Sequence, residues 1–218
     1  MQKRAFRILL LVSLLIIISC SKDKSTNPSN SDVVVPLTIG NEWIYVELDD
    51  DLNIEEWSKQ SVIETRNINL NNQDIEVAVL ADYSKYSIDD PWELHNGRNL
   101  YRNNSDGLYY YGFIDEDKNG AKDSIYFLEE TLEVKYPVNV GDSWVRESGL
   151  EWTCIAVDEE IDIPAGNFSC IVIRANISHE DEWYIYRYYC VNVGFVASYY
   201  SGVEGEPEAW VKLESYNF

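Results

Sequence analysis

The stretch PLTIGNEW, Pro36–Trp43, returns 101 residues later as PVNVGDSW, Pro137–Trp144. In both copies apolar residues alternate with polar ones up to a glycine, and a tryptophan stands three residues after that glycine. Glycine at this place permits a sharp turn, and the segment beyond it predicts a strand that buries its tryptophan. The chain therefore holds two turn-and-strand segments of one design, and this repetition decides the fold.

Two further segments repeat in the same order along the chain. INLNNQDIEVAVL, Ile68–Leu80, overlays IDIPAGNFSCIVI, Ile161–Ile173, at an offset of 93 residues. DGLY, Asp106–Tyr109, overlays VGFV, Val193–Val196, at an offset of 87 residues. The falling offsets indicate that the second copy has shorter loops, and each copy contains strand-like runs separated by turn residues.

Composition and turn spacing predict an all-β fold. Turn signals recur about every 8–12 residues, helical periodicity is not sustained, and seven Trp and sixteen Tyr supply a large core. We predict an antiparallel meander of two related units that forms a curved sheet, a sandwich or an open barrel, with few short helices. The units are expected at about 36–114 and 137–218, linked by 115–136. Asp89–Leu94 is the place for a short helix or a turn.

The first twenty residues are typical of a secretory signal. Three basic residues precede an apolar run that ends at Ile18, which is too short for a stable membrane-spanning helix. Cys20 stands where bacterial lipoprotein signals carry the cysteine that is acylated. We therefore predict a signal peptide over 1–19, lipidation at Cys20 and a flexible polar tether over 20–35. The alternative is an ordinary signal peptide with a chance cysteine.

The charge balance excludes one class of partner. The 17 Lys and Arg fall to 14 once Lys3, Arg4 and Arg7 are removed with the signal, so 38 acidic residues leave a net charge of −24. Such a surface repels nucleic acid and anionic lipid head groups. It suits cations, or it serves solubility alone.

Three cysteines follow the acylation site, namely Cys154, Cys170 and Cys190. Because the export route is oxidising, one disulfide and one free thiol are expected. The runs around the last two cysteines read as the strands of a hairpin. If Ile177 faces Trp183, Cys170 falls opposite Cys190, and we predict that these two pair. Three buried thiols are the alternative.

The segment DEDKNGAKD, residues 115–123, has the spacing of a calcium-binding loop. Its oxygen ligands would come from Asp115, Asp117, Asn119, the carbonyl of Ala121, and Asp123. The twelfth place is Tyr126 instead of a bidentate glutamate, and no helix pattern flanks the loop. We expect weak, structural Ca²⁺ binding, with a Kd of about 10⁻⁴ M or poorer. A tight Asn-Gly turn in an acidic hairpin is the alternative.

No residue is assigned a catalytic role. Gly141–Ser143 matches the nucleophile block of GDS-type esterases, but the first copy has Glu42 at the place of Ser143. A glycine turn that enters a strand is therefore the favoured interpretation. His95 and His179 are far apart in the sequence and lack the spacing of a zinc site.

Two tyrosine-rich runs, 108–113 and 184–189, place aromatic rings on both faces of a strand. Cross-strand aromatic pairs that support the sheet are the favoured interpretation. Exposed rings that stack on a sugar or contact a partner are the alternative.

Four segments of the second copy resemble a family of uncharacterised bacterial lipoproteins. They are VGDSW at 140–144, IDIPAGNFSC at 161–170, YYCVNVGFV at 188–196 and LESYN at 213–217. The family pattern is VGxxW…PAGxFxC…YYxxxVG…LxSY, and the first copy departs from it because Asn71–Gln73 replaces the PAG turn. The resemblance implies a curved antiparallel sheet or an open barrel at the cell envelope, without assigned catalytic residues. Ser21 after the cysteine resembles the sorting signal of outer-membrane lipoproteins, with either a periplasmic or an external position.

The sequence thus favours a lipid-anchored cell-envelope protein with a non-catalytic binding or structural role. The candidate partners are a glycan, an apolar ligand in a β cavity, or another envelope protein. The alternative is an envelope hydrolase that uses a carboxylate pair. A hydrolase would bring acids together in a cleft, whereas a binding protein would show an aromatic strip or an apolar cavity.

Overall fold

The computed structural model describes residues 33–49, 51–115, 124–126, 129–146, 148–178, 183–201 and 208–218. Within these ranges the chain forms 13 strands and no helix. The described chain accordingly offers no helix with the length and apolarity needed to cross a membrane.

The strands of the first unit and the connecting segment are β1 (Glu42–Leu48), β2 (Ile54–Leu70), β3 (Gln73–Lys85), β4 (Glu93–Asn104), β5 (Gly107–Asp115), β6 (Ser124–Tyr126) and β7 (Thr131–Lys135). Those of the second unit are β8 (Ser143–Val145), β9 (Glu151–Ile163), β10 (Gly166–Asn176), β11 (Tyr184–Cys190), β12 (Gly194–Ser201) and β13 (Glu208–Asn217).

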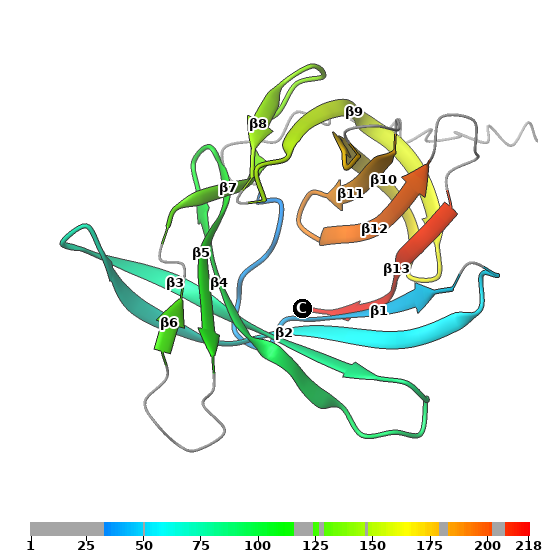
Figure 1. The fold of residues 1–218 in the computed structure, drawn as a ribbon, viewed down its shortest axis with the longest axis horizontal. Helices are drawn as coiled ribbons and strands as arrows, with labels where there is room; N and C mark the ends of the chain where they lie inside the picture. The colour runs from blue at the N-terminus through cyan, green and yellow to red at the C-terminus, as the bar shows by residue number, and fades with distance from the viewer. Residues whose placement is uncertain are drawn as a thin grey trace, which may run out of the picture.

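All strands belong to one antiparallel sheet. Its order is β6-β5-β4-β3-β2-β1-β13-β12-β11-β10-β9-β8, and β7 pairs with β5 beside β6. The last strand, β13, pairs with the first, β1, and so joins the two units. Figure 1 shows the sheet curling round until β7 and β8 lie next to each other. The predicted all-β meander of two related units is confirmed, in the form of a curved sheet.

The two units have matching strand ends and matching turns. β2 and β9 end at residues 70 and 163, and β3 and β10 begin at 73 and 166, which keeps the offset seen in the sequence. Gly40 and Gly141 have φ values of 95° and 93°. The Gly40 amide donates to the carbonyl of Val62 (2.9 Å), and the Gly141 amide donates to that of Cys154 (2.8 Å). The repeated glycine therefore makes the same turn twice.

The ends of the sheet meet at a seam between β7 and β8. The last strand of the second unit, β13, pairs with the first strand of the first unit, β1, so the repeat leads one to expect that β7 pairs with β8. However, β8 has only three residues, and no ladder joins it to β7 in the described chain. Side chains connect them: the indole of Trp144 donates to the carbonyl of Glu133 (3.2 Å), and Lys135 pairs with Asp142 (3.0 Å). The segment 115–136, expected to be a linker, therefore contributes two strands, β6 and β7, to the sheet.

One large core fills the inside of the sheet. It includes side chains of both units, among them Trp43, Tyr45, Trp152, Phe168 and Leu213. A smaller core lies against β3–β5 and contains Ile68, Val77, Val79, Leu100, Tyr111 and Ile114. Because one core serves both units, they form a single domain.

The folded domain begins before the predicted boundary at Pro36. Val34 is only 1% exposed and belongs to the large core. The carbonyl of Val33 accepts a hydrogen bond from the amide of Asn192 (2.7 Å). Burial of a valine side chain stabilises by about 1.5–3 kcal/mol, so the last residues of the expected tether are part of the fold.

The few short helices expected from the sequence are absent from the described residues. At Asp89–Leu94 the alternative of a turn holds: the amide of Asp90 donates to the carbonyl of Ser87 (3.1 Å), and β4 begins at Glu93. From Glu93 onward the chain pairs with β3 instead, with Glu93 opposite Ser84.

Candidate functional site

A cavity of about 280 Å³ lies inside the curved sheet and is lined from both units. Its apolar and aromatic lining includes Val35, Trp43, Tyr45, Leu80, Leu108 and Phe195. Its charged lining consists of Glu47, Glu133, Arg146 and Arg187. Known small-molecule pockets run from about 300 to 1,000 Å³ and are mostly apolar with a few polar groups. The cavity therefore has the composition of a ligand site, at the small end of the range.

Strand alternation places the β1 side chains in the cavity. Trp43, Tyr45 and Glu47 occupy alternate positions of β1 and so share one face. The Tyr45 hydroxyl donates to the carbonyl of Phe195 (3.2 Å), which fixes the ring across the sheet. Burial raises the pKa of Tyr45 well above its usual value, so this hydroxyl stays neutral.

A buried ion pair lines the cavity at the seam between β7 and β8. Arg146, the second residue after Trp144, is directed to the same side as that indole and pairs with Glu133 of β7. The two side chains are 9% and 12% exposed. Burial, and to a lesser degree the charge of Arg187, lowers the pKa of the Arg146 guanidinium, which nevertheless stays charged. Its Nη1 is buried and has no hydrogen-bond partner among the described residues.

A single indole lies against two guanidinium groups. The Cζ atoms of Arg146 and Arg187 are 4.9 and 5.0 Å from the ring centroid of Trp152. Trp152 is 2% exposed, and its Nε1 likewise has no partner in the described chain. Cation–π attraction holds the two like charges near each other. The two positive charges of the lining are thus held next to each other, against an indole that lies behind them.

Comparison of the two units shows where this charge comes from. Arg146 stands 101 residues after Tyr45, the same offset that relates Trp144 to Trp43. In the ladders, Trp43 faces Gln60 and Trp144 faces Trp152. The second unit therefore carries an arginine and a tryptophan where the first carries a tyrosine and a glutamine. Arg146 lies two residues beyond the end of the repeated segment. The only signal for it in the sequence is that it replaces Tyr45 of the first unit.

The predicted calcium ligands lie almost wholly outside the described residues. Asp115 is the exposed last residue of β5. Asp117, Asn119, Ala121 and Asp123 fall in the range 116–123, which the structure does not describe. Within the described chain, no three His, Cys, Asp or Glu side chains gather in a way that could hold a metal ion. Weak Ca²⁺ binding at 115–123 stays a prediction from the sequence.

The cysteine register agrees with the sequence argument. In the β10–β11 ladder Ile171 faces Tyr189, which puts Cys170 opposite Cys190, and the Ile177 amide donates to the carbonyl of Trp183 (2.9 Å). Both cysteines are free thiols in this structure, as is Cys154. Burial raises the pKa of Cys190 to about 11 and that of Cys170 further. The Cys170–Cys190 disulfide therefore stays a prediction for the oxidised protein. Cys20 lies outside the described residues.

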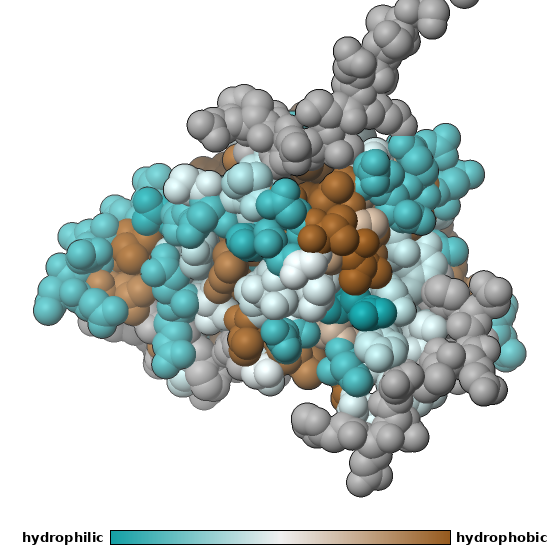
Figure 2. All heavy atoms as spheres, turned by 90° about the horizontal axis from the view of Figure 1, so that it is seen from above, coloured by the Kyte–Doolittle hydropathy of each residue, from teal (hydrophilic) through white to brown (hydrophobic). Residues whose placement is uncertain are grey.

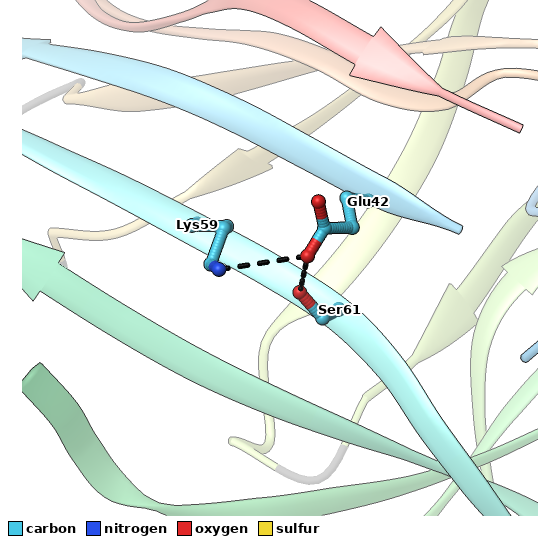
Figure 3. A network of polar contacts seen from close by, with 3 residues as sticks. All are labelled: Glu42, Lys59 and Ser61. Carbon is cyan, nitrogen blue, oxygen red and sulfur yellow. Dashed lines mark hydrogen bonds and ion pairs between the residues drawn. The ribbon is translucent and has the colours of Figure 1, made fainter. Parts of the chain in front are cut away.

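The Gly-Asp-Ser segment has a structural role at the start of β8. The Ser143 hydroxyl donates to the Glu151 carboxylate (3.0 Å) on the exposed hairpin. At the equivalent place in β1, Glu42 accepts hydrogen bonds from Ser61 (2.8 Å) and Lys59 (3.5 Å) of β2, as Figure 3 shows. In both units this position makes a polar contact between neighbouring strands. The side chains of His95 and His179 lie outside what the structure describes.

The acids with shifted pKa values lie away from the cavity. The pKa of Asp49 is lowered chiefly by a hydrogen bond from the Asn53 amide, and that of Asp142 chiefly by one from the Asn139 amide. In the cavity, Glu133 is paired with Arg146. A carboxylate in such a pair is a poor general acid.

Several aromatic rings of the sheet are paired with another ring or covered by a lysine. Lys59 lies over the rings of Tyr83 and Trp92, at 4.7 and 5.4 Å from their centroids. Tyr188 packs edge-on against Tyr199 with centroids 5.2 Å apart. This is the arrangement that the sheet-support interpretation of the tyrosine runs predicts. Seen from above, the surface shows several hydrophobic groups among mostly hydrophilic residues (Figure 2).

Comparisons with known proteins bear on the fold. No protein-family profile matches the sequence, and no curated protein matches it. Two solved structures are similar. One is a protein from Bacteroides fragilis described as exported and of YmcC-like fold (TM-score 0.54, 13% identity, 86% of this chain and 100% of that one). The other is from Parabacteroides distasonis and is described as a lipoprotein (TM-score 0.54, 15% identity, 85% and 99%). At these identities the likeness shows that the chain is similar to both in fold.

Proposed function

We propose that this protein is a lipid-anchored cell-envelope protein whose curved sheet binds a small amphipathic or apolar ligand without catalysis. The observation that carries the binding role is the cavity of about 280 Å³, because its lining is mainly apolar and aromatic and comes from both units. Apolar walls with few polar groups are typical of sites that hold a ligand by burial of its surface.

The envelope location rests on the N-terminal sequence. Basic residues, a short apolar run and Cys20 follow one another as in lipoprotein signals. The two proteins of similar fold, one described as exported and one as a lipoprotein, agree with this assignment. Ser21 supports the outer membrane, facing either the periplasm or the exterior. Acyl chains would then hold the domain at the membrane.

Binding is favoured over hydrolysis by the state of the cavity acids. A hydrolase that used a carboxylate pair would need one carboxyl group with a raised pKa to serve as the acid. Glu133 is instead held in a buried pair with Arg146. The cavity thus offers fixed charges and apolar walls, which position a ligand.

The binding role is tested with N-phenyl-1-naphthylamine, a neutral apolar dye that fluoresces when buried. The protein is the mature chain carrying Cys20→Ala, which lacks the acyl anchor and so avoids lipid that would take up the dye. We expect saturable binding, weakened at least about tenfold by Leu108→Trp, because the larger side chain fills the cavity. Leu52→Trp, at a position 59% exposed, is the matched control and should bind as the parent does. No saturable binding by the parent would reject the proposed function.

The anchor is tested separately in cells by incorporation of labelled palmitate. We expect label in the parent and none in Cys20→Ser, because the thiol is the acylated group. Cys190→Ser keeps Cys20 and should remain labelled. Equal labelling of the parent and Cys20→Ser would reject the lipid anchor and leave the cavity proposal to its own test.

A further inference from the structure

Within the ligand site proposed above, we infer that Arg146 and Arg187 form a head-group subsite that takes the carboxylate of an amphipathic monoanion, with its apolar body along the aromatic wall. This inference rests on the proposed function and specifies the class of its ligand.

The donors are built into the core. The Arg146 side chain is 9% exposed and lines the cavity, yet its Nη1 has no hydrogen-bond partner among the described residues. A buried donor without a partner costs about 1–3 kcal/mol, and more when the group is charged. Native proteins rarely leave such a group unsatisfied without a reason. A ligand oxygen at this place would satisfy it.

One guanidinium of the cavity has no ion-pair partner in the part of the chain that the structure describes. Arg146 pairs with Glu133, whereas Arg187 has no such partner there. Glu47 is the second acid of the lining and has interactions of its own. The two guanidiniums share the indole of Trp152, so the positive end of the lining lies there. Guanidinium groups bind carboxylates through parallel hydrogen bonds.

The rest of the cavity suits an apolar chain. Leu108, Phe195 and Val211 belong to the same lining as the two arginines. A carboxylate at the arginines with a hydrocarbon or aromatic body against these walls would fill both parts of the site. A neutral molecule of the same shape would leave the arginine donors unpaired.

The experiment compares octanoate with octanol, which share a chain and differ in the charge of the head group. Each displaces the dye from the mature Cys20→Ala chain. We expect octanoate to displace it at about tenfold lower concentration. Arg187→Met removes the guanidinium that has no ion-pair partner among the described residues, so no carboxylate there loses its counter-charge. Arg146→Lys keeps a cation for Glu133 but loses the planar donor pair. Both should bring the two displacement curves within about threefold of each other.

Arg174→Met is the matched control, because Arg174 also contacts an aromatic ring, that of Tyr184 at 4.6 Å, but does not line the cavity. It should keep the full preference for octanoate. Equal displacement by octanoate and octanol, with dye binding intact, would overturn the head-group subsite and leave the cavity proposal standing. A preference for octanoate that survives in both arginine variants would also overturn it. Absence of dye binding would reject the proposed function itself.

Discussion

Glu133 and Arg146 form an ion pair across the seam at which the two ends of the sheet meet, and within the described residues no strand ladder joins these ends. Glu133 belongs to β7, the last strand of the first half, and Arg146 follows β8, the first strand of the second. This ion pair therefore joins the two ends of the sheet, and it also places two of the charged side chains that line the cavity.

Removal of the acid from this pair should destabilise the fold strongly. Glu133→Ala leaves a guanidinium buried without its counter-charge, and the expected loss is about 3 kcal/mol of the free energy of unfolding. Urea denaturation of the mature chain measures it. Glu151→Ala removes an exposed acid of the neighbouring hairpin and should cost less than about 0.5 kcal/mol. Similar losses in the two variants would show that the seam pair does not hold the fold together.

Two glycines with almost the same backbone conformation should respond differently to alanine. Gly97 and Gly141 have φ values of 95° and 93°, so alanine is strained at both. A Cβ at Gly97 would lie 2.6 Å from the carbonyl oxygen of Ile114, whereas at Gly141 it meets nothing within 4 Å. We expect Gly97→Ala to cost about 2 kcal/mol more than Gly141→Ala. Thermal melts of both variants decide this, and equal losses would contradict the packing of β4 against β5.

Stability should fall as the pH rises through the alkaline range because of Cys154. Burial raises the pKa of this thiol to about 11, above the value of about 8.5 in an unfolded chain. The neutral thiol is favoured in the folded state, so its stabilising contribution is complete below pH 8.5 and is lost between about 8.5 and 11. We expect a loss of up to about 3 kcal/mol from this thiol. Cys154→Ala should make stability fall less steeply with pH between 9 and 10, and an unchanged slope would contradict this assignment.

Export should join Cys170 to Cys190. The register places them opposite each other, and the envelope is oxidising. Peptide mapping of exported protein, alkylated without reductant, should find these two linked and Cys154 free. A disulfide that closes a loop of this size stabilises by about 3 kcal/mol, so reduction should lower the melting temperature. Alkylation of both cysteines before any reduction would contradict the pairing.

Local patterns predicted most of the fold. The repeated glycine-to-tryptophan segment located β1 and β8, and hairpin symmetry located the register around Cys170 and Cys190, because turns and alternation are properties of neighbouring residues. The boundary at Pro36 was wrong for the opposite reason. Val34 is buried by packing against residues far along the chain, which a local pattern does not show.

The candidate site was mostly hidden from sequence reasoning. Nothing in the sequence distinguishes Glu133 and Arg146 from the many other charged residues. They come together only because the sheet curls until its two ends meet. β7 was taken for linker because five residues between loops carry little periodicity. The sequence did name an apolar ligand in a β cavity as one of three candidate partners. It did not predict that two arginines would line one part of that cavity.

The central claim is that the curved sheet holds an amphipathic ligand inside, and a crystal structure of the mature chain grown with octanoate tests it most directly. We predict density for the hydrocarbon chain of octanoate between Tyr45, Leu108 and Phe195. Its carboxylate should lie against Arg146 and Arg187. Octanoate found only on the outer surface, with no density in the cavity at saturating concentration, would contradict the claim.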